Sequence, residues 1–226
     1  MTEAEWRTGD HPARLLDFIG DKFSDRRFRL LAIAFVRRNW HLLRDERSRV
    51  AVEQSENYAD GKVSIELVHE SALAAIDAAQ STAFPAHAAR AACFELATRQ
   101  RGAAAGTSVA ADESSFAATS YLVQEGDGLT YDLGGLVTEQ VVQCQLLRDI
   151  FGNPFRPVTF DPRWRTSDVV DVARGIYEDK AFERMPILAD ALMDAGCEDE
   201  QIIGHCRGEG PHVRGCWVVD LVLGKG

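Results

Sequence analysis

The apolar positions of the chain recur with a helical period over most of its length. The clearest stripe lies between residues 27 and 43 and has a spacing close to i, i+3, i+4, i+7, formed by Phe28, Leu31, Ala32, Phe35, Val36, Leu42 and Leu43. This spacing is typical of an amphipathic helix that buries one face. Ser24 or Asp25 can cap the start of this helix.

Further helices are expected on both sides of the middle of the chain. A more polar helix follows over 45–58, and two alanine-rich helices are expected over 64–80 and 85–101. Alanine has a high helix propensity but buries little area, so these two helices should pack closely and weakly. In the last third, apolar stripes predict five helices, over 138–152, 166–177, 186–196, 198–207 and 211–224, of which three are bounded by glycine or proline and one begins at a capping Thr166 or Ser167.

The segment 102–135 interrupts the helical pattern. It is rich in Gly, Ala, Ser and Thr and contains the turn signals Gly126-Asp127-Gly128 and Gly134-Gly135. Two interpretations stay open. The segment forms a small hairpin, in which 121–123 pairs with 129–133, or it is a disordered loop between two helical halves.

The expected fold is therefore mainly α, a multi-helix bundle of eight or nine short helices with a hairpin or disordered insert. The expected parts are an N-terminal helical half (1–101), a Gly/Ala/Ser-rich insert or linker (102–136) and a C-terminal helical half (137–226). The two halves can also pack as one domain.

Composition changes this picture little. The 226 residues are 46% hydrophobic and 27% charged, with a net charge of −10, which excludes a disordered tail and argues against a nucleic-acid coat protein. No uncharged apolar run approaches the ~20 residues that cross a bilayer, so no membrane partner is expected. The first residues lack the pattern of a signal peptide. We therefore expect a cytoplasmic location, in which the five cysteines are reduced thiols.

Five segments are distinctive as sequences. They read MTEAEW, SDRRFRLLAIAFVRRNWHLLRDERSRVAVEQSENYADG, LLRDIFGNPFRPVTFDPRW, PILADALMDAGC and HCRGEGPHVRGCWVVDLVLGK. In these segments the chain resembles a family of uncharacterised proteins abundant in planctomycete-type bacteria. The middle of the chain, 102–135, differs from the alanine-rich helical stretch of that family. The resemblance implies a shared fold and no particular reaction.

The C-terminal part of the chain holds the main candidate for a metal site. It contains three cysteines and two histidines, Cys197, His205, Cys206, His212 and Cys216. Zn²⁺ takes four thiolate or imidazole ligands. If Pro211 begins a helix, His212 and Cys216 share one face as i and i+4, and Cys197 and Cys206 flank the preceding helix. These four residues are the candidate zinc ligands; the alternative is core thiols and surface histidines with no cofactor.

The same residues allow a thiol nucleophile beside an imidazole base, as in a cysteine hydrolase. Cys206 adjoins His205, while Cys216 has His212 nearby and Asp220 four residues later. Cys216 lies within the apolar stretch GCWVVDLVLG, which indicates a buried and inert thiol. We therefore assign no catalytic residue and do not expect an enzyme.

Asp220 interrupts an apolar run near the C-terminus. A buried carboxylate needs a partner, because an unpaired buried charge costs several kcal/mol, as an order of magnitude. Four arginines are candidate partners, Arg37, Arg38, Arg207 and Arg214, and we predict an ion pair between Asp220 and Arg214.

Residues 26–49 are basic in an otherwise acidic chain. They contain eight arginines against Asp45 and Glu46, a local charge of +6. A candidate basic surface for phosphates or an acidic partner consists of Arg26, Arg29, Arg37, Arg38 and Arg44. The alternative, which we favour, is that these arginines pair with acids of the same chain, so that nucleic acid is not an expected partner.

No glycine-rich phosphate loop, HExxH motif or GxSxG motif is present. The expected function is a non-catalytic interaction or adaptor module with a protein partner, because Trp, Phe and Arg residues near turns are types enriched in binding hot spots. Two alternatives stay open. One is a structural-zinc protein that uses the C-terminal Cys/His site, and the other is a weak nucleic-acid binder that uses Arg26–Arg49.

Overall fold

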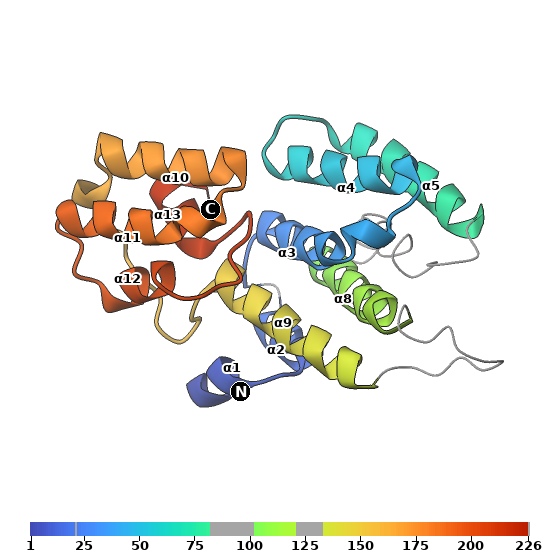
Figure 1. Cartoon of the computed structure of the whole chain (residues 1–226), viewed down its shortest axis with the longest axis horizontal. Helices are drawn as coiled ribbons and strands as arrows, with labels where there is room; N and C mark the ends of the chain where they lie inside the picture. The colour runs from blue at the N-terminus through green and yellow to red at the C-terminus, as the bar shows by residue number, and fades with distance from the viewer. Residues whose placement is uncertain (21, 82–101, 121–132, 226) are drawn as a thin grey trace. The chain divides into compact units, whose positions relative to one another are not determined.

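A computed structural model of the chain describes residues 1–20, 22–81, 102–120 and 133–225 (Figure 1). These residues form eleven α-helices and three short 3-10 helices and contain no strand, so the expected mainly-α class is confirmed. The expected count of eight or nine is exceeded, because two short helices precede residue 20 and another forms after residue 102. Among the same residues, no helix has the length and hydropathy that a bilayer crossing requires.

The chain divides into two compact units, Met1–Cys144 and Gln145–Gly226. The division lies within one long helix, α9 (Leu133–Phe151). It falls close to residue 137, where we expected the C-terminal half to begin, and it places the expected insert 102–136 in the first unit.

The first unit is built around α3 (Asp25–Arg38). Nine consecutive residues of this helix, Phe28–Val36, are buried, because helices pack on more than one of its faces. It packs against α4 (Glu46–Ala59) and α8 (Ala103–Ser120), and α4 packs against α5 (Ile65–Ser81) (Figure 1). The unit also contains α1 (Glu3–Thr8), α2 (Pro12–Ile19) and the 3-10 helix η1 (Trp40–Leu42).

The helix α8 corrects the expectation of a hairpin or loop over 102–135. Its alanine content favours a helix, and the small side chains of Ala110, Ala111 and Ala117 are buried. The hydroxyl of Thr107 donates a hydrogen bond to the carbonyl of Phe28, which joins α8 to α3. The residues expected to form the hairpin, up to position 132, lie outside the described residues, and Leu133 begins α9.

The second unit consists of the last turns of α9 and several short helices around an apolar core. These are η2 (Pro162–Trp164), α10 (Ser167–Asp179), η3 (Phe182–Arg184), α11 (Met185–Asp194), α12 (Glu200–Cys206) and α13 (Trp217–Leu223). The helix α10 packs against α11 and α13, and α11 packs against α12. The predicted helices over 166–177, 186–196 and 198–207 correspond to α10, α11 and α12.

The segment between α12 and α13 differs from the prediction. Pro211 does not begin a helix; residues 207–216 form a loop, and α13 begins at Trp217. Gly210 and Gly215 have φ values of +81° and +96°, which side chains disfavour and which interrupt a right-handed helix. We call residues 207–216 the α12–α13 loop. His212 and Cys216 both belong to it and therefore do not share a helix face.

Candidate metal centre

The centre of the candidate site is Asp149, in the last turn of α9. Its side chain is only 3% exposed. Its Oδ1 lies 2.7 Å from Nδ1 of His212 and 3.1 Å from Nε2 of His205, and its Oδ2 accepts a hydrogen bond of 2.9 Å from the backbone N–H of Val213. A buried carboxylate is stable only with such donors, because desolvation of its charge is costly.

The two imidazoles that contact Asp149 come from α12 and from the loop that follows it. His205 lies in the last turn of α12, and His212 lies in the α12–α13 loop. Their ring centroids are 4.8 Å apart with an edge-on arrangement, and the ring of Trp217 lies 5.2 Å from that of His205. The side chains of His205 and His212 are 18% and 8% exposed, so little water reaches them.

Cys216 completes the cluster. It is fully buried at the start of α13, and its Sγ lies 3.1 Å from Nε2 of His205. One ligand atom from each of Asp149, His205, His212 and Cys216 lies within 4.8 Å of the other three. One carboxylate, two imidazoles and one thiol thus converge on a single point in the second unit.

Contacts outside the cluster orient two of these ligands. The backbone N–H of Val213 donates a hydrogen bond to Oδ2 of Asp149, and Oδ1 of the same carboxylate faces the imidazoles. The Nε2 of His212 lies 3.4 Å from the carbonyl oxygen of Gly208, a weak contact that directs Nδ1 inward. Groups of this kind, which hold the far side of a ligand, are a regular feature of protein metal sites.

The electrostatics of the site follow from burial and from the close pairs. Burial alone would raise the pKa of Asp149, but hydrogen bonds from His205 and His212 and the charge of both rings bring that pKa below its ordinary value. Burial likewise opposes the charged form of His212, yet the bond to Asp149 and its negative charge raise the pKa of His212. Without a metal, His212 therefore tends to carry the positive charge that balances Asp149.

The thiol of Cys216 is chemically quiet in this environment. Burial and the negative charge of Asp149 raise the pKa of Cys216 well above its ordinary value. A protonated and fully buried thiol is a poor nucleophile. A bound divalent cation reverses this preference, because a coordinating thiol is deprotonated outright.

Two of the four ligands predicted from the sequence, His212 and Cys216, are members of the cluster. The other two, Cys197 and Cys206, are not; they lie in the apolar core of the second unit and are 3% and 0% exposed. Burial, with the charges of Cys197 and Asp149, raises the pKa of Cys206 to about 12. Of the adjacent pair at 205 and 206, the histidine points into the site and the cysteine into the core.

Asp149 is not among the candidate ligands that the sequence predicts. A weak signal existed, since Asp149 stands among the buried apolar residues Leu146, Leu147 and Ile150, immediately before the break at Gly152. An acidic residue at such a position requires a partner. The sequence alone does not say that the partners are histidines more than fifty residues later.

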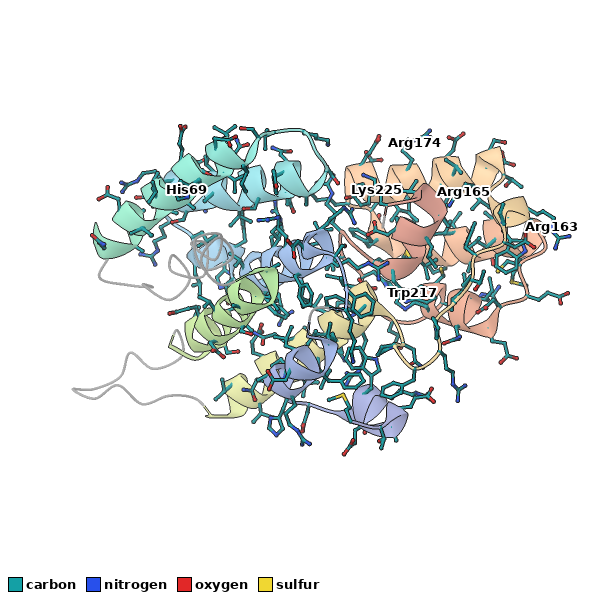
Figure 2. The ribbon with its side chains drawn as sticks, turned by 180° about the vertical axis from the view of Figure 1, so that it is seen from behind. His69, Arg163, Arg165, Arg174, Trp217 and Lys225 are labelled. Atoms are coloured by element: carbon teal, nitrogen blue, oxygen red, sulfur yellow. The ribbon has the colours of Figure 1, made fainter. Side chains whose placement is uncertain are left out.

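The buried carboxylate that the sequence analysis did single out is Asp220, which is 1% exposed. The guanidinium of Arg214 lies over the ring of Tyr177, 4.6 Å from its centroid, and Nζ of Lys225 lies 4.2 Å from the same centroid. In Figure 2, Lys225 and Trp217 are labelled close to α13. The ion pair between Asp220 and Arg214 stays a prediction.

Most arginines of the candidate basic surface contact groups of the first unit. Arg37 forms two bonds of 2.6 Å with the buried Glu56, and Arg38 bonds Glu139 at 2.8–2.9 Å. The remaining contacts are Arg26 with the carbonyl of Ala59 and with Asp60, and Arg29 over the ring of Tyr58. Arg44 is exposed. The favoured interpretation, pairing with acids of the same chain, thus applies to Arg26, Arg37 and Arg38.

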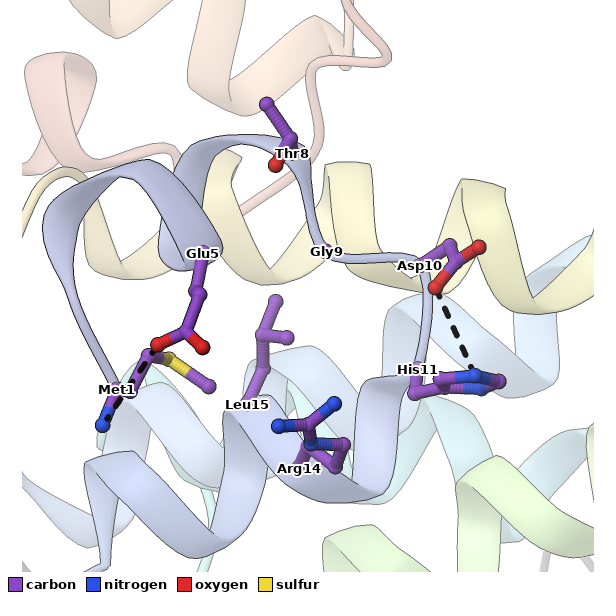
Figure 3. A pocket seen from close by; sticks show the side chains of 8 residues that line it. All are labelled: Met1, Glu5, Thr8, Gly9, Asp10, His11, Arg14 and Leu15. Carbon is purple, nitrogen blue, oxygen red and sulfur yellow. Dashed lines mark ion pairs between the residues drawn. The ribbon is translucent and has the colours of Figure 1, made fainter.

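A small hollow beside α1 and α2 is a weaker candidate (Figure 3). It has a volume of about 120 Å³, and its charged lining residues include Glu5, Asp10, His11 and Arg14. Glu5 caps α1 in a reciprocal bond with Thr2, and the side chains of Asp10 and His11 are more than 60% exposed. This arrangement is that of a solvated surface and does not gather reactive groups.

The chain was compared with protein-family models, with curated proteins and with solved structures, and none of the three comparisons found a match.

Proposed function

We propose that this chain is a non-catalytic protein whose second unit binds one structural Zn²⁺ through Asp149, His205, His212 and Cys216. The observation that carries the proposal is the convergence of these four donor atoms within 4.8 Å of one another. Carboxylate oxygen, imidazole nitrogen and thiolate sulfur are the three donor types that Zn²⁺ binds in proteins.

The spacing of the donors fits a tetrahedral ion. Zinc–ligand bonds of about 2.0–2.3 Å imply distances of about 3.3–3.7 Å between ligand atoms. The shortest distances in the cluster, 2.7 Å and 3.1 Å, are hydrogen-bond distances, and the longest is within 4.8 Å. The three hydrogen-bond distances, 2.7 Å, 3.1 Å and 3.1 Å, each need to lengthen by about 1 Å or less when metal bonds replace these hydrogen bonds.

The charge and softness of the donors favour Zn²⁺ over other common divalent ions. Ionised Asp149 and Cys216 together carry two negative charges, which a divalent ion neutralises within a buried site. Mg²⁺ and Ca²⁺ prefer sites made of oxygen ligands, whereas a thiolate and two imidazoles suit a borderline-soft ion.

A structural role is favoured over a catalytic one. Four protein ligands fill a tetrahedral coordination shell, whereas catalytic zinc sites keep one position for water or substrate. Asp149 and Cys216 are buried, and neither imidazole side chain is more than 18% exposed. A cytoplasmic, reducing location belongs to the proposal, because Cys216 must remain a free thiol to bind the ion.

An adaptor role with a protein partner is the second candidate. It is favoured by two large apolar side chains on α11, Ile187 and Met193, which are 55% and 47% exposed. Crosslinking from native lysate tests it, with the Ile187→Asp chain as the matched control. Equal capture by both chains removes this support.

Metal analysis of the purified chain tests the zinc proposal. We expect about one zinc per chain after dialysis, and little zinc in the His205→Ala and Cys216→Ala variants. The matched controls are Cys197→Ala and Cys206→Ala, which remove thiols outside the cluster and should keep the zinc. Circular dichroism checks that each variant is helical. Less than one zinc per several chains refutes the proposal. Loss of zinc from the Cys197→Ala variant also refutes it, because the ion is then bound by residues outside the proposed cluster.

A further inference from the structure

Resting on the proposed zinc site, we infer that the ion controls the order of the α12–α13 loop, residues 207–216, so that this loop is a metal-dependent surface of the protein. Figure 1 shows the loop in red between α12 and α13.

The loop has little regular structure of its own. It contains three glycines, Gly208, Gly210 and Gly215, and two of them adopt positive φ angles. The backbone hydrogen bonds at its ends are local, from Gly208 N–H to the carbonyl of His205 and from Cys216 N–H to the carbonyl of Val213. Glycine-rich backbone loses more conformational freedom on ordering than other backbone does.

Two residues in the middle of the loop, His212 and Val213, are held to α9 by the side chain of Asp149, and the next residue, Arg214, lies over the Tyr177 ring of α10. Oδ1 of Asp149 binds the ring of His212, and Oδ2 binds the amide of Val213, across a sequence separation of more than sixty residues. Near the first end of the loop, Arg207 bonds Asp190, but both side chains are more than half exposed, and such pairs stabilise little.

The four donors are placed so that one ion fixes the whole loop. His205 lies two residues before the loop, His212 lies in its middle and Cys216 is its last residue, while Asp149 supplies the anchor on α9. Metal bonds to these residues pin the loop at both ends and at its centre. The free energy of binding then becomes free energy of ordering, because a disordered loop cannot present its ligands together.

Loss of the ion leaves the loop held by the pairs with Asp149 and by the contact of Arg214 with the Tyr177 ring. We therefore expect local opening of the loop to be more frequent in metal-free protein, in which the closed loop with its Asp149 contacts is still the most populated form, while the core of the unit, formed by α10 and α11, stays folded. Arg207 is exposed and Arg214 is half-buried, so an open loop offers two cleavage sites to trypsin.

Hydrogen–deuterium exchange of the full chain, with one equivalent of Zn²⁺ and with a chelator, tests this inference. Zinc should slow exchange of peptides that cover 207–216 by roughly tenfold or more and protect Arg207 and Arg214 from trypsin. Peptides from α3 and α10 should exchange equally in both conditions. The Glu209→Gln variant, altered at an exposed loop position, should keep the zinc effect, and His212→Gln should lose it.

The outcomes separate the two proposals. If zinc binds at one equivalent and exchange in the loop is unchanged, the inference is overturned and the proposed zinc site stands. A zinc effect of the same size in α10 and α11 also overturns it, because the ion then stabilises the whole unit. If Zn²⁺ does not bind, the proposed function itself fails, and the inference fails with it.

Discussion

The replacement Asp149→Asn should destabilise the second unit strongly in metal-free protein. Asparagine has nearly the same shape, and its amide oxygen can still accept the bond from Val213 N–H. What is lost is the negative charge opposite His205 and His212, at 3.1 Å and 2.7 Å. The replacement therefore tests how much the negative charge of Asp149 contributes to stability, because the packing changes little.

The magnitude follows from the burial of the partners. Asp149 is 3% exposed and the His212 side chain 8%, so solvent screens their interaction little. Hydrogen bonds to charged groups contribute about 1.5–3 kcal/mol each, and the loss of one partner of a buried pair costs about 3–5 kcal/mol. We expect Asp149→Asn to lower the free energy of unfolding of the second unit by about 3 kcal/mol. In a unit of this size that corresponds to a decrease of roughly 10–20 °C in its melting temperature.

The loss should depend on pH in a defined direction. The pKa of Asp149 is lowered on folding, so its contribution is present above about pH 4 and is lost as the pH falls through the folded value. The pKa of His212 is raised, so its contribution is present below about pH 6.5 and is lost as the pH rises through the folded value. The replacement should therefore cost most between about pH 4 and 6.5.

Differential scanning calorimetry in the presence of a chelator, at pH 5.5 and pH 9, measures this effect. The difference in melting temperature between the natural chain and Asp149→Asn should be clearly larger at pH 5.5. Equal differences at the two pH values would refute the assignment of a charged His212–Asp149 pair. If the replacement lowers the free energy of unfolding by less than about 1 kcal/mol at pH 5.5, then burial does not strengthen the pair as we infer.

Three further predictions concern the site and its supports. Zinc affinity should fall about tenfold or more per pH unit of acidification, because the raised pKa of Cys216 keeps a proton on the thiol that the metal must displace; calorimetry in two buffers measures the proton release. Gly152→Ala should cost about 1–3 kcal/mol in thermal unfolding, because Gly152 has a φ of +68° and a Cβ there would lie 3.3 Å from the Trp217 ring. Glu56→Gln should cost about 1–3 kcal/mol in urea unfolding, because Glu56 is buried and binds Arg37 through both oxygens.

Each of these predictions has a matched control. Cys206→Ala should leave the proton release unchanged, since Cys206 lies in the core and outside the cluster. Gly175→Ala, at an open position within α10, should stabilise the chain slightly, in contrast to Gly152→Ala. Arg163→Ala removes an ion pair with Asp161 whose arginine is 88% exposed (Figure 2), and it should change stability by less than about 0.5 kcal/mol. Effects of similar size in controls and tests would contradict the role assigned to burial and strain.

Local sequence signals were sufficient for most helices of the second unit. Thr166 caps α10 through Val169 N–H, and Pro186 stands in the first turn of α11, as both residue types predict. The same signals failed at α8. There, serine, threonine and glycine suggested a loop, but the alanines formed a helix that packs against α3. The high helix propensity of alanine, together with packing against the buried helix α3, outweighed the preference of serine, threonine and glycine for loops.

The candidate site was also predicted only in part from the sequence. His212 and Cys216 could be selected from the sequence, because their side chains are typical zinc ligands and they lie four residues apart. The helix that was expected to align them does not form, since Gly210 and Gly215 take positive φ angles. The loop aligns them instead, with His212 held by Asp149.

The sequence by itself determined the helical class of this protein, because the period of its apolar positions is a local property that needs no knowledge of distant residues. Only the tertiary structure decided which polar side chains meet. Asp149 lies 63 residues before His212, and only the packed second unit brings α9 beside the α12–α13 loop. Contacts at such separations depend on how the helices pack, and the spacing of residues along the chain does not encode them.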